Sequence, residues 1–149
     1  MSAALLLGLF FFAPPLERGF DLDRLSGAPE RVEVAAAPLV VHFWASWCEG
    51  CVEELPALAR AAESCRDAQT RVLLVNAGES SAAVRAFSRP LGLSAHVLLD
   101  PKGAAWRRSG ARGLPANWIW NGREGRLVEG PMRADEWRAL LEGLGCRAR

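Results

Sequence analysis

The stretch FWASWCEGC, residues 43–51, carries two cysteines three positions apart at the end of an apolar run. That run, LVVHFWA at residues 39–45, has the length and the near-continuous apolar character of a strand buried on both faces. Behind it, side chains recur at helical spacing: Val52, Leu55, Leu58, Ala62 and Cys65. The sequence therefore predicts a buried strand followed by a helix over residues 48–65, with Cys48 at its start.

The two cysteines differ in their expected surroundings. Cys48 lies at the helix start, where free backbone N–H groups and the helix dipole stabilise a thiolate and lower the pKa of the thiol. Cys51 lies one turn further along, on the apolar stripe, and we expect it to be the more buried of the two. This asymmetry suits disulfide exchange, in which an exposed thiolate attacks and a protected neighbour resolves the mixed disulfide.

A metal site and a structural bridge are the alternatives for this pair. Cys65 lies 14 residues beyond Cys51, about 21 Å away along a continuous helix, so it cannot share a metal with the pair. His42 is close enough in principle, but no fourth ligand is evident. A bridge between residues three positions apart constrains little chain entropy. We therefore predict neither a metal nor an organic cofactor.

The rest of the chain alternates between strand and helix patterns. Pro56 falls inside the first helix, where we expect a kink or a weakened first turn. The alternation predicts an α/β fold that ends with an antiparallel hairpin around Asn121-Gly122. Further strands are expected at residues 31–34, 71–77, 96–99, 117–120 and 126–129, and further helices at residues 81–89, 104–109 and 135–144.

Length and composition exclude several classes of protein. A chain of 149 residues suits one domain, and half of its residues are hydrophobic, which argues against disorder. The formal net charge is only +1 and the arginines are scattered, so we expect no nucleic-acid partner. Four cysteines are too few to define a small disulfide scaffold at this length.

The N-terminus carries an uninterrupted apolar run, AALLLGLFFFA at residues 3–13. Its eleven residues match the apolar region of a signal peptide, whereas a membrane-spanning helix needs about 20. We expect residues 1–15 to be a signal peptide or a short membrane anchor, and residues 16–149 to be the folded domain; a buried strand is the alternative for the run. Export implies an oxidising compartment.

The cysteine segment and two distant segments agree with one another. FWASWCEGC resembles the active-site segment of the thioredoxin superfamily, with its usual tryptophan before the first cysteine. GLPANWIW, residues 113–120, looks like the cis-proline loop of that family, and NAGES, residues 76–80, resembles the segment with the active-site glutamate of its ResA-like branch. The 64 positions from Cys51 to Pro115 leave room for that branch's extra helix and strand. The chain is thus similar to extracytoplasmic TlpA/ResA-like thiol–disulfide oxidoreductases.

This resemblance implies a thioredoxin-like three-layer sandwich, with a mixed central sheet, helices on both faces and an inserted helix–strand unit before the cis-proline loop. It implies an enzyme that exchanges a Cys48–Cys51 dithiol with the disulfides of protein substrates, more often as a reductant. A membrane redox partner would supply electrons, and the family suggests cytochrome c maturation or general extracytoplasmic reduction. We expect a monomer that is periplasmic or anchored so that it faces the periplasm.

The resemblance also implies roles for individual residues. Cys48 would attack the substrate disulfide and Cys51 would resolve the mixed disulfide. Pro115 would be cis, and the backbone of Leu114 would lie beside Cys48 and pair with an extended substrate segment. Glu79 would tune the cysteine pKa values and handle a proton.

Two aromatic residues and a histidine complete the expected site. Trp47 and Trp44 would shape an apolar surface around it, with core packing as the alternative for Trp44. His42 stands where thioredoxin-like proteins carry a buried acid. Desolvation would keep its imidazole neutral and able to accept a proton from Cys51; the alternative is a core histidine bonded to backbone.

Glu49 and Gly50, between the cysteines, depart from the ResA-like pattern, which more often has Glu-Pro. Gly50 loosens the helix start and keeps a backbone N–H that proline lacks. Glu49 adds a negative charge that opposes thiolate formation at Cys48. We therefore expect a thiol less acidic than those of strongly oxidising relatives, which favours a reductant or a mild exchanger.

Two further groups of residues keep open interpretations. If the last helix lies beside the active-site helix, as the resemblance implies, Cys65 and Cys146 lie at the pole opposite the site. They either form a structural disulfide or remain two separate thiols. The arginines Arg107-Arg108 and Arg112 are either a solvated face or a docking site for an acidic partner.

Competing functions fit the sequence less well. A peroxiredoxin would need a threonine and a proline where this chain has Ala45 and Val41. A copper chaperone of similar fold would need a longer cysteine spacing and a downstream histidine. A non-catalytic binding module or a metallochaperone using the Cys-x-x-Cys pair stays the alternative, but both cysteines are present together with Glu79 and Pro115, which favours exchange.

Overall fold

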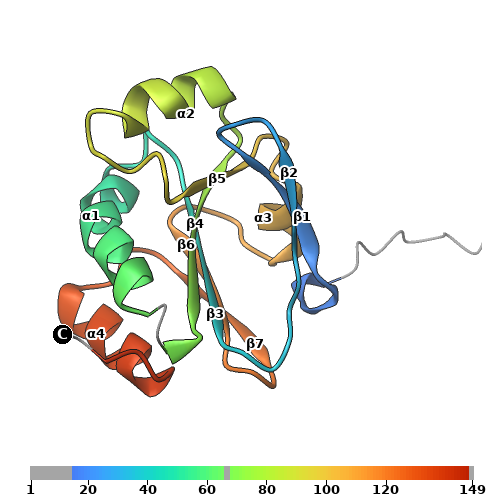
Figure 1. Ribbon diagram of the computed structural model, residues 1–149, viewed down its shortest axis with the longest axis vertical. Helices are drawn as coiled ribbons and strands as arrows, with labels where there is room; N and C mark the ends of the chain where they lie inside the picture. Colours follow the sequence, from blue (N-terminus) through green and yellow to red (C-terminus); the bar gives the residue numbers. More distant parts are fainter. Residues whose placement is uncertain (1–14, 66–67, 148–149) are drawn as a thin grey trace, which may run out of the picture.

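One mixed sheet of seven strands organises the computed structural model, which describes residues 15–65 and 68–147 (Figure 1). The strand order is β2-β1-β5-β4-β3-β6-β7; β3, β4 and β5 are parallel, and the other neighbours are antiparallel. The strands are β1 (Phe20–Arg24), β2 (Pro29–Val32), β3 (Leu39–Trp44), β4 (Arg71–Ala77), β5 (Val97–Asp100), β6 (Ala116–Trp120) and β7 (Gly125–Glu129). The helical segments are η1 (Leu16–Arg18), α1 (Glu49–Ser64), α2 (Ser81–Ser88), α3 (Ala104–Arg108) and α4 (Ala134–Gly143).

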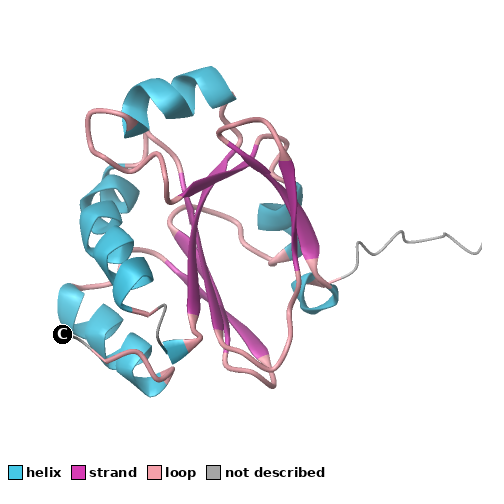
Figure 2. Cartoon of the chain, in the orientation of Figure 1, coloured by secondary structure: helices cyan, strands magenta, loops and turns pink. Residues whose placement is uncertain are grey.

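Helices cover both faces of this sheet (Figure 2). Because side chains alternate along a strand, β3 contributes to two cores. Val40 and Trp44 pack in the core that α1 and α4 complete, whereas Val41 and Phe43 pack in the core beside α3. Every residue of β3 is buried. The predicted three-layer α/β sandwich is therefore confirmed.

The α2–β5 unit is the expected insertion before the cis-proline loop. β5 lies between β4 and β1 in the sheet, and α2 connects β4 to it. The side chain of Ser80 caps α2, because its hydroxyl accepts a hydrogen bond from the backbone N–H of Ala83 at 3.2 Å. This confirms the inserted helix–strand unit.

The hairpin of β1 and β2 differs most from expectation. The strand expected at residues 31–34 lies two residues earlier, at Pro29–Val32, and it pairs with β1, a strand absent from the sequence-based predictions. In β1, Phe20 and Leu22 are buried, whereas the aspartates between and after them are more exposed. Five residues of this kind are too few for periodicity to separate a strand from a charged loop.

The apolar run of residues 3–13 lies outside the described residues, so its expected role as a signal peptide or anchor stays a prediction. The same is true of the expected domain boundary near residue 15. Within residues 15–65 and 68–147, no helix has the length and apolar character needed to cross a membrane.

A second disulfide joins the ends of α1 and α4. Cys65 follows α1, Cys146 follows α4, and their sulfurs are 2.18 Å apart. Both cysteines are buried. Nearby, the hydroxyl of Thr70 donates a hydrogen bond to the carbonyl of Leu144 at 2.7 Å. α1 remains helical through the exposed Pro56, so the two disulfides of the chain stand at opposite ends of one helix.

Replacing Cys65 and Cys146 together by alanine is expected to lower the free energy of unfolding. The bridge spans 81 residues, and removing a loop closure of this size costs about 4 kcal/mol, because the unfolded chain regains conformational freedom. Urea unfolding under non-reducing conditions measures the loss.

The matched control replaces Cys48 and Cys51, whose bridge spans three residues and constrains little entropy. An equal loss of stability in both double variants would contradict the prediction. So would a non-reducing peptide map of the oxidised protein without a linked Cys65–Cys146 peptide.

Candidate active site

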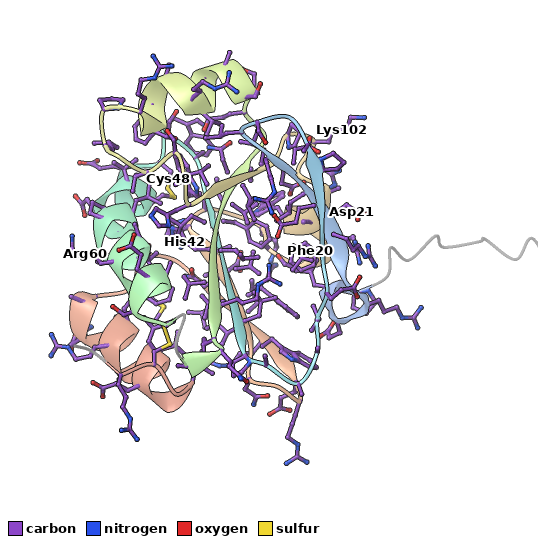
Figure 3. All side chains as sticks on the ribbon, viewed as in Figure 1. Phe20, Asp21, His42, Cys48, Arg60 and Lys102 are labelled. Atoms are coloured by element: carbon purple, nitrogen blue, oxygen red, sulfur yellow. A yellow bond between two sulfur atoms is a disulfide. The ribbon has the colours of Figure 1, made fainter. Side chains whose placement is uncertain are left out.

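Cys48 and Cys51 form a disulfide at the start of α1, with their sulfurs 2.11 Å apart. Cys48 is the residue at which the helix begins, in an extended backbone conformation. It is 8% exposed, whereas Cys51 is fully buried. Figure 3 shows Cys48 near the upper end of α1. An incoming sulfur can therefore approach Cys48 but not Cys51.

The cis-proline loop lies against this helix start. The Leu114–Pro115 peptide bond is cis. A Cβ atom placed on Gly50 would lie 4.0 Å from Cδ of Pro115 and 3.5 Å from Cβ of Pro131, both ordinary contact distances. The structure thus brings together the cysteine pair and the loop, which are far apart in the sequence.

Glu129, at the end of β7, holds the loop in place. One carboxylate oxygen of Glu129 accepts hydrogen bonds from the backbone N–H groups of Arg112, at 2.7 Å, and Gly113, at 3.2 Å. The backbone N–H of Gly130 donates to the carbonyl of Pro115 at 2.9 Å. Glu129 is absent from the sequence-based predictions, because a glutamate at a strand end carries no distinguishing signal.

Glu79 ties the loop before Cys48 to the end of β4. Its carboxylate accepts hydrogen bonds from the backbone N–H and the hydroxyl of Ser46, at 2.8 and 2.6 Å, and from the side-chain amide of Asn76, at 2.6 Å. Partial burial alone would raise the pKa of Glu79, but the hydrogen bonds from Asn76 and Ser46 lower it overall. Glu79 therefore remains ionised at neutral pH, as a fixed negative charge beside the active-site loop.

A second carboxylate, Glu54, is buried one helical turn beyond Cys51. The spacing of three residues places both side chains on one face of α1. One oxygen of Glu54 accepts hydrogen bonds from the backbone N–H of Met132 and from Nε1 of Trp137, the latter at 3.0 Å. The other oxygen has no hydrogen-bond partner among the described residues. Glu54 is absent from the sequence-based predictions, because Glu53-Glu54 has the appearance of a solvated helix face.

His42 faces Glu54 from β3, between the sheet and α1 (Figure 3). Nδ1 of His42 lies 2.7 Å from Oδ1 of Asn117. Because a carbonyl oxygen only accepts, Nδ1 carries the proton of the neutral ring and Nε2 keeps its lone pair. Nε2 lies 4.0 Å from the free oxygen of Glu54, and within the described chain neither atom has a hydrogen-bond partner. The hydrogen bond of His42 is thus to the side chain of Asn117, whereas the core-histidine alternative expected a bond to backbone.

Burial drives both groups toward their neutral forms. It lowers the pKa of His42 to about 4, against the opposing effect of the hydrogen bond with Asn117. It raises the pKa of Glu54, against the hydrogen bonds from Met132 and Trp137. A protonated Glu54 would direct its O–H at the lone pair on Nε2 of His42. With that one proton on Glu54 and a neutral imidazole, the pair carries no buried net charge.

The two tryptophans of the motif lie in different surroundings. Trp47 is 73% exposed, directly before Cys48. Trp44 is fully buried and packs against Phe87, with ring centroids 5.5 Å apart. Of the two roles left open for Trp44, the structure shows core packing, because the alternation along β3 directs its side chain into the core beneath α1.

The part of the chain that the structure describes contains no group of three or more His, Cys, Asp or Glu side chains arranged to hold a metal ion. Its four cysteines are all paired in the two disulfides. In this oxidised state no thiolate is available as a metal ligand.

Substituting His42 by asparagine is expected to reduce the loss of stability on the acid side. In the unfolded chain His42 binds a proton as the pH falls through 6.5, whereas in the folded protein it does so only near pH 4. Stability therefore falls with pH across this window, by up to about 3 kcal/mol from this group. Asparagine keeps a donor for Asn117 but does not titrate.

Urea unfolding of the wild type and of His42→Asn at pH 7 and pH 4 measures the effect. His96→Asn is the matched control, because His96 is partly exposed beside Glu63. If His42→Asn keeps the wild-type pH dependence, the buried imidazole is not neutral as described.

Comparison with known proteins identifies the family. A family model described as the AhpC/TSA family matches residues 19–127, more than half of the chain. Thiol-disulfide oxidoreductase ResA of Bacillus subtilis (strain 168) is 30% identical over 113 residues, which are 74% of this chain and 62% of ResA. The chain thus spans less than two thirds of the length of this curated relative.

Solved structures agree with this assignment. MTB dsbF superposes with a TM-score of 0.78 at 25% identity, covering 88% of this chain and 98% of that one. The exposed lipoprotein thioredoxin Etrx1 of Streptococcus pneumoniae strain TIGR4 superposes with a TM-score of 0.71 at 25% identity, covering 83% and 98%. The chain therefore belongs to the AhpC/TSA family, as a TlpA/ResA-like member of the thioredoxin superfamily.

Proposed function

We propose that this protein is a thiol–disulfide oxidoreductase that exchanges its Cys48–Cys51 pair with the disulfides of protein substrates. The observation that carries the proposal is the position of the Cys48–Cys51 disulfide at the start of α1 beside the cis-proline loop, where a Cβ atom placed on Gly50 would lie 4.0 Å from Cδ of Pro115. A purely structural bridge has no need of such a loop. Exchange needs a place where a substrate segment can lie beside the reactive sulfur. The name of the ResA relative points to the same activity.

In the reducing direction the exchange consists of two displacements. The Cys48 thiolate attacks a substrate sulfur, forms a mixed disulfide and releases the second substrate sulfur as a thiolate, which takes up a proton. The Cys51 thiolate then attacks Sγ of Cys48, which releases the first substrate sulfur and closes the Cys48–Cys51 disulfide. Two electrons and two protons pass to the substrate, and a donor dithiol restores the protein by the reverse steps.

Leu114 and Trp47 are proposed to bind the substrate. Leu114 directly precedes Pro115, and β6 begins only at Ala116, so the backbone of Leu114 lies outside the sheet. An extended substrate segment can hydrogen-bond to it by β-augmentation. The exposed indole of Trp47 offers an apolar surface next to Cys48.

The Glu54–His42 pair is proposed to take the proton of Cys51. Cys51 is fully buried, so its thiol has to lose its proton inside the protein before it can attack. Glu54 shares its helix face, and the unpartnered atoms of Glu54 and His42 face each other. Two roles were expected of Glu79: tuning the cysteine pKa values and transferring a proton. Its lowered pKa favours the first, because an ionised carboxylate that accepts three hydrogen bonds acts as a fixed charge.

The reducing direction and an extracytoplasmic location are part of the proposal. Glu49 is exposed in the first turn of α1, where its charge opposes thiolate formation at Cys48. The apolar run at residues 3–13 and the similarity to an exposed lipoprotein support export. A membrane redox partner would then supply electrons to the monomeric protein, and proteins of cytochrome c maturation are candidate substrates.

A Cys51→Ser variant tests this function. Purified reduced wild type is expected to reduce the disulfides of insulin, whereas Cys51→Ser cannot complete the second displacement and accumulates mixed disulfides through Cys48. In the native host, non-reducing electrophoresis and mass spectrometry would identify the trapped substrates. The control variant, with both Cys48 and Cys51 replaced by serine, is expected to trap nothing. Absence of trapped proteins together with failure to reduce insulin would rule out the enzyme.

Glu54→Gln is expected to slow the resolution of a mixed disulfide about 100-fold near neutral pH, the lower end of what a general acid–base group contributes. Release of a peptide thiol from a preformed mixed disulfide at Cys48 gives the rate. The deficit narrows at higher pH, where a larger fraction of Cys51 is already ionised without the help of Glu54. Glu53→Gln removes the same charge from the exposed neighbouring position and is expected to resolve at the wild-type rate. Equal rates in the two variants would exclude Glu54 as the proton acceptor.

A further inference from the structure

A groove crosses the edge of the sheet at which the parallel strands end. β3, β4 and β5 are parallel, so the segments that follow them meet at one edge, where ligands of open α/β sheets commonly bind. These segments, with α3 and the cis-proline loop, enclose a cavity of about 350 Å³. Figure 3 shows Cys48 and Lys102 on either side of this edge. We name the cavity the Trp47 groove; its lining includes Trp47, Trp106, Leu114, Lys102, Arg107 and Arg112.

Three of the lining residues are cations. Lys102 lies in the turn after β5, Arg107 on α3 and Arg112 in the loop before Leu114, and all three are exposed. No aspartate or glutamate lines the groove. Among residues 15–65 and 68–147, none of the three cations makes an ion pair. Arg107 donates a hydrogen bond to the carbonyl of Lys102 at 2.7 Å, which neutralises neither charge.

This local excess of positive charge is not a property of the whole surface. The formal net charge of the chain is only +1. Along the β1–β2 hairpin and at the start of β4, arginines are paired with carboxylates: Arg24 with Glu30, Arg31 with Asp21, and Arg71 with Glu30. With three cations and no lining carboxylate, the Trp47 groove therefore attracts negative charge.

Apolar side chains line the groove together with the cations, and one of them, Trp47, directly precedes Cys48. Trp47 is 73% exposed, and the partly buried Trp106 and Leu114 line the same cavity. A substrate held through its sulfur on Cys48 thus lies next to the exposed Trp47, whereas Lys102 lies on the other side of the sheet edge (Figure 3). Because an extended chain advances about 3.3 Å per residue, side chains a few positions from the substrate cysteine reach the cationic part.

We propose that the Trp47 groove selects extended substrate segments that carry an apolar side chain beside the cysteine and carboxylates a few residues further along. Lys102, Arg107 and Arg112 are the specificity-determining residues, and charge complementarity favours this acidic peptide as the occupant. The inference rests on the proposed exchange function and adds the substrate class. It also assigns a partner to Arg107 and Arg112 of the arginine cluster, whereas Arg108 donates hydrogen bonds to the carbonyls of Pro15 and Gly19.

Two synthetic peptides test the proposal. Both contain one central cysteine, disulfide-bonded to uncharged 2-mercaptoethanol, with an apolar neighbour. The first carries glutamates at the third to fifth positions on each side of the cysteine, and the second carries glutamines there. Reduced full-length protein is mixed with each peptide, and the released peptide thiol is quantified by chromatography after acid quenching.

The acidic peptide is expected to react about tenfold faster than the neutral one at low ionic strength, because the cations steer and hold it. At about 0.5 M NaCl the two rates are expected to lie within about twofold, because salt screens exposed charges. The double variant Lys102→Gln with Arg112→Gln is expected to lower the ratio of the two rates to about threefold or less. Both side chains are exposed, and the hydrogen bonds that Lys102 and Arg112 make among the described residues come from their backbone.

The matched control is Arg126→Gln with Arg138→Gln, which removes the same charge from exposed positions on β7 and α4, outside the groove. It is expected to keep the wild-type ratio. Equal rates for the two peptides in the wild type, or an equal loss in the control, would overturn the groove proposal while exchange activity stands. If neither peptide is reduced at all, the exchange function itself fails.

Discussion

The pairing of β3 with β4 on one side and with β6 on the other fixes the position of every group in the site. The register places His42 opposite Asn117 on β6, which is why these two side chains meet in a hydrogen bond. It places Trp44 opposite Asn76, from which the chain turns to Glu79. It also places Phe43 opposite Ala116, so that the cis-proline loop emerges beside the end of β3. A slip of one residue would separate all of these groups.

Two glutamates illustrate how surroundings decide what one residue type does. Glu79 receives three hydrogen bonds and its pKa is lowered, so it serves as a fixed charge. Glu54 is desolvated, its pKa is raised, and one oxygen lacks a partner among the described residues. An unpartnered buried polar atom costs about 1–3 kcal/mol. Apolar side chains at positions 42 and 54 would avoid that cost, so stability alone does not account for the pair.

The sequence predicts the fold well where local pattern and burial coincide. The apolar run of β3, the periodicity of α1 and the alternation that follows identify the central sheet and the cysteine pair. Glu54 escapes prediction because its burial depends on Met132 and Trp137, which arrive from about 80 positions away. The partner of His42 likewise requires the register of β3 with β6. For Trp44 the motif leaves a surface role and core packing both open, and the alternation along β3 decides for the core.

The position of the second disulfide has a consequence for how the fold responds to its surroundings. Cys48–Cys51 and Cys65–Cys146 stand at the two ends of α1, so one helix carries both the bond that the proposed exchange would open and a bond that restrains the chain. A reductant strong enough to open both disulfides would produce the free thiols of Cys48 and Cys51. It would also remove the covalent bond that ties the C-terminal helix α4 to α1. The free energy of unfolding of this protein therefore depends on the redox potential of its surroundings. The same chain made in a reducing cytosol would lack the Cys65–Cys146 bond and would be less stable.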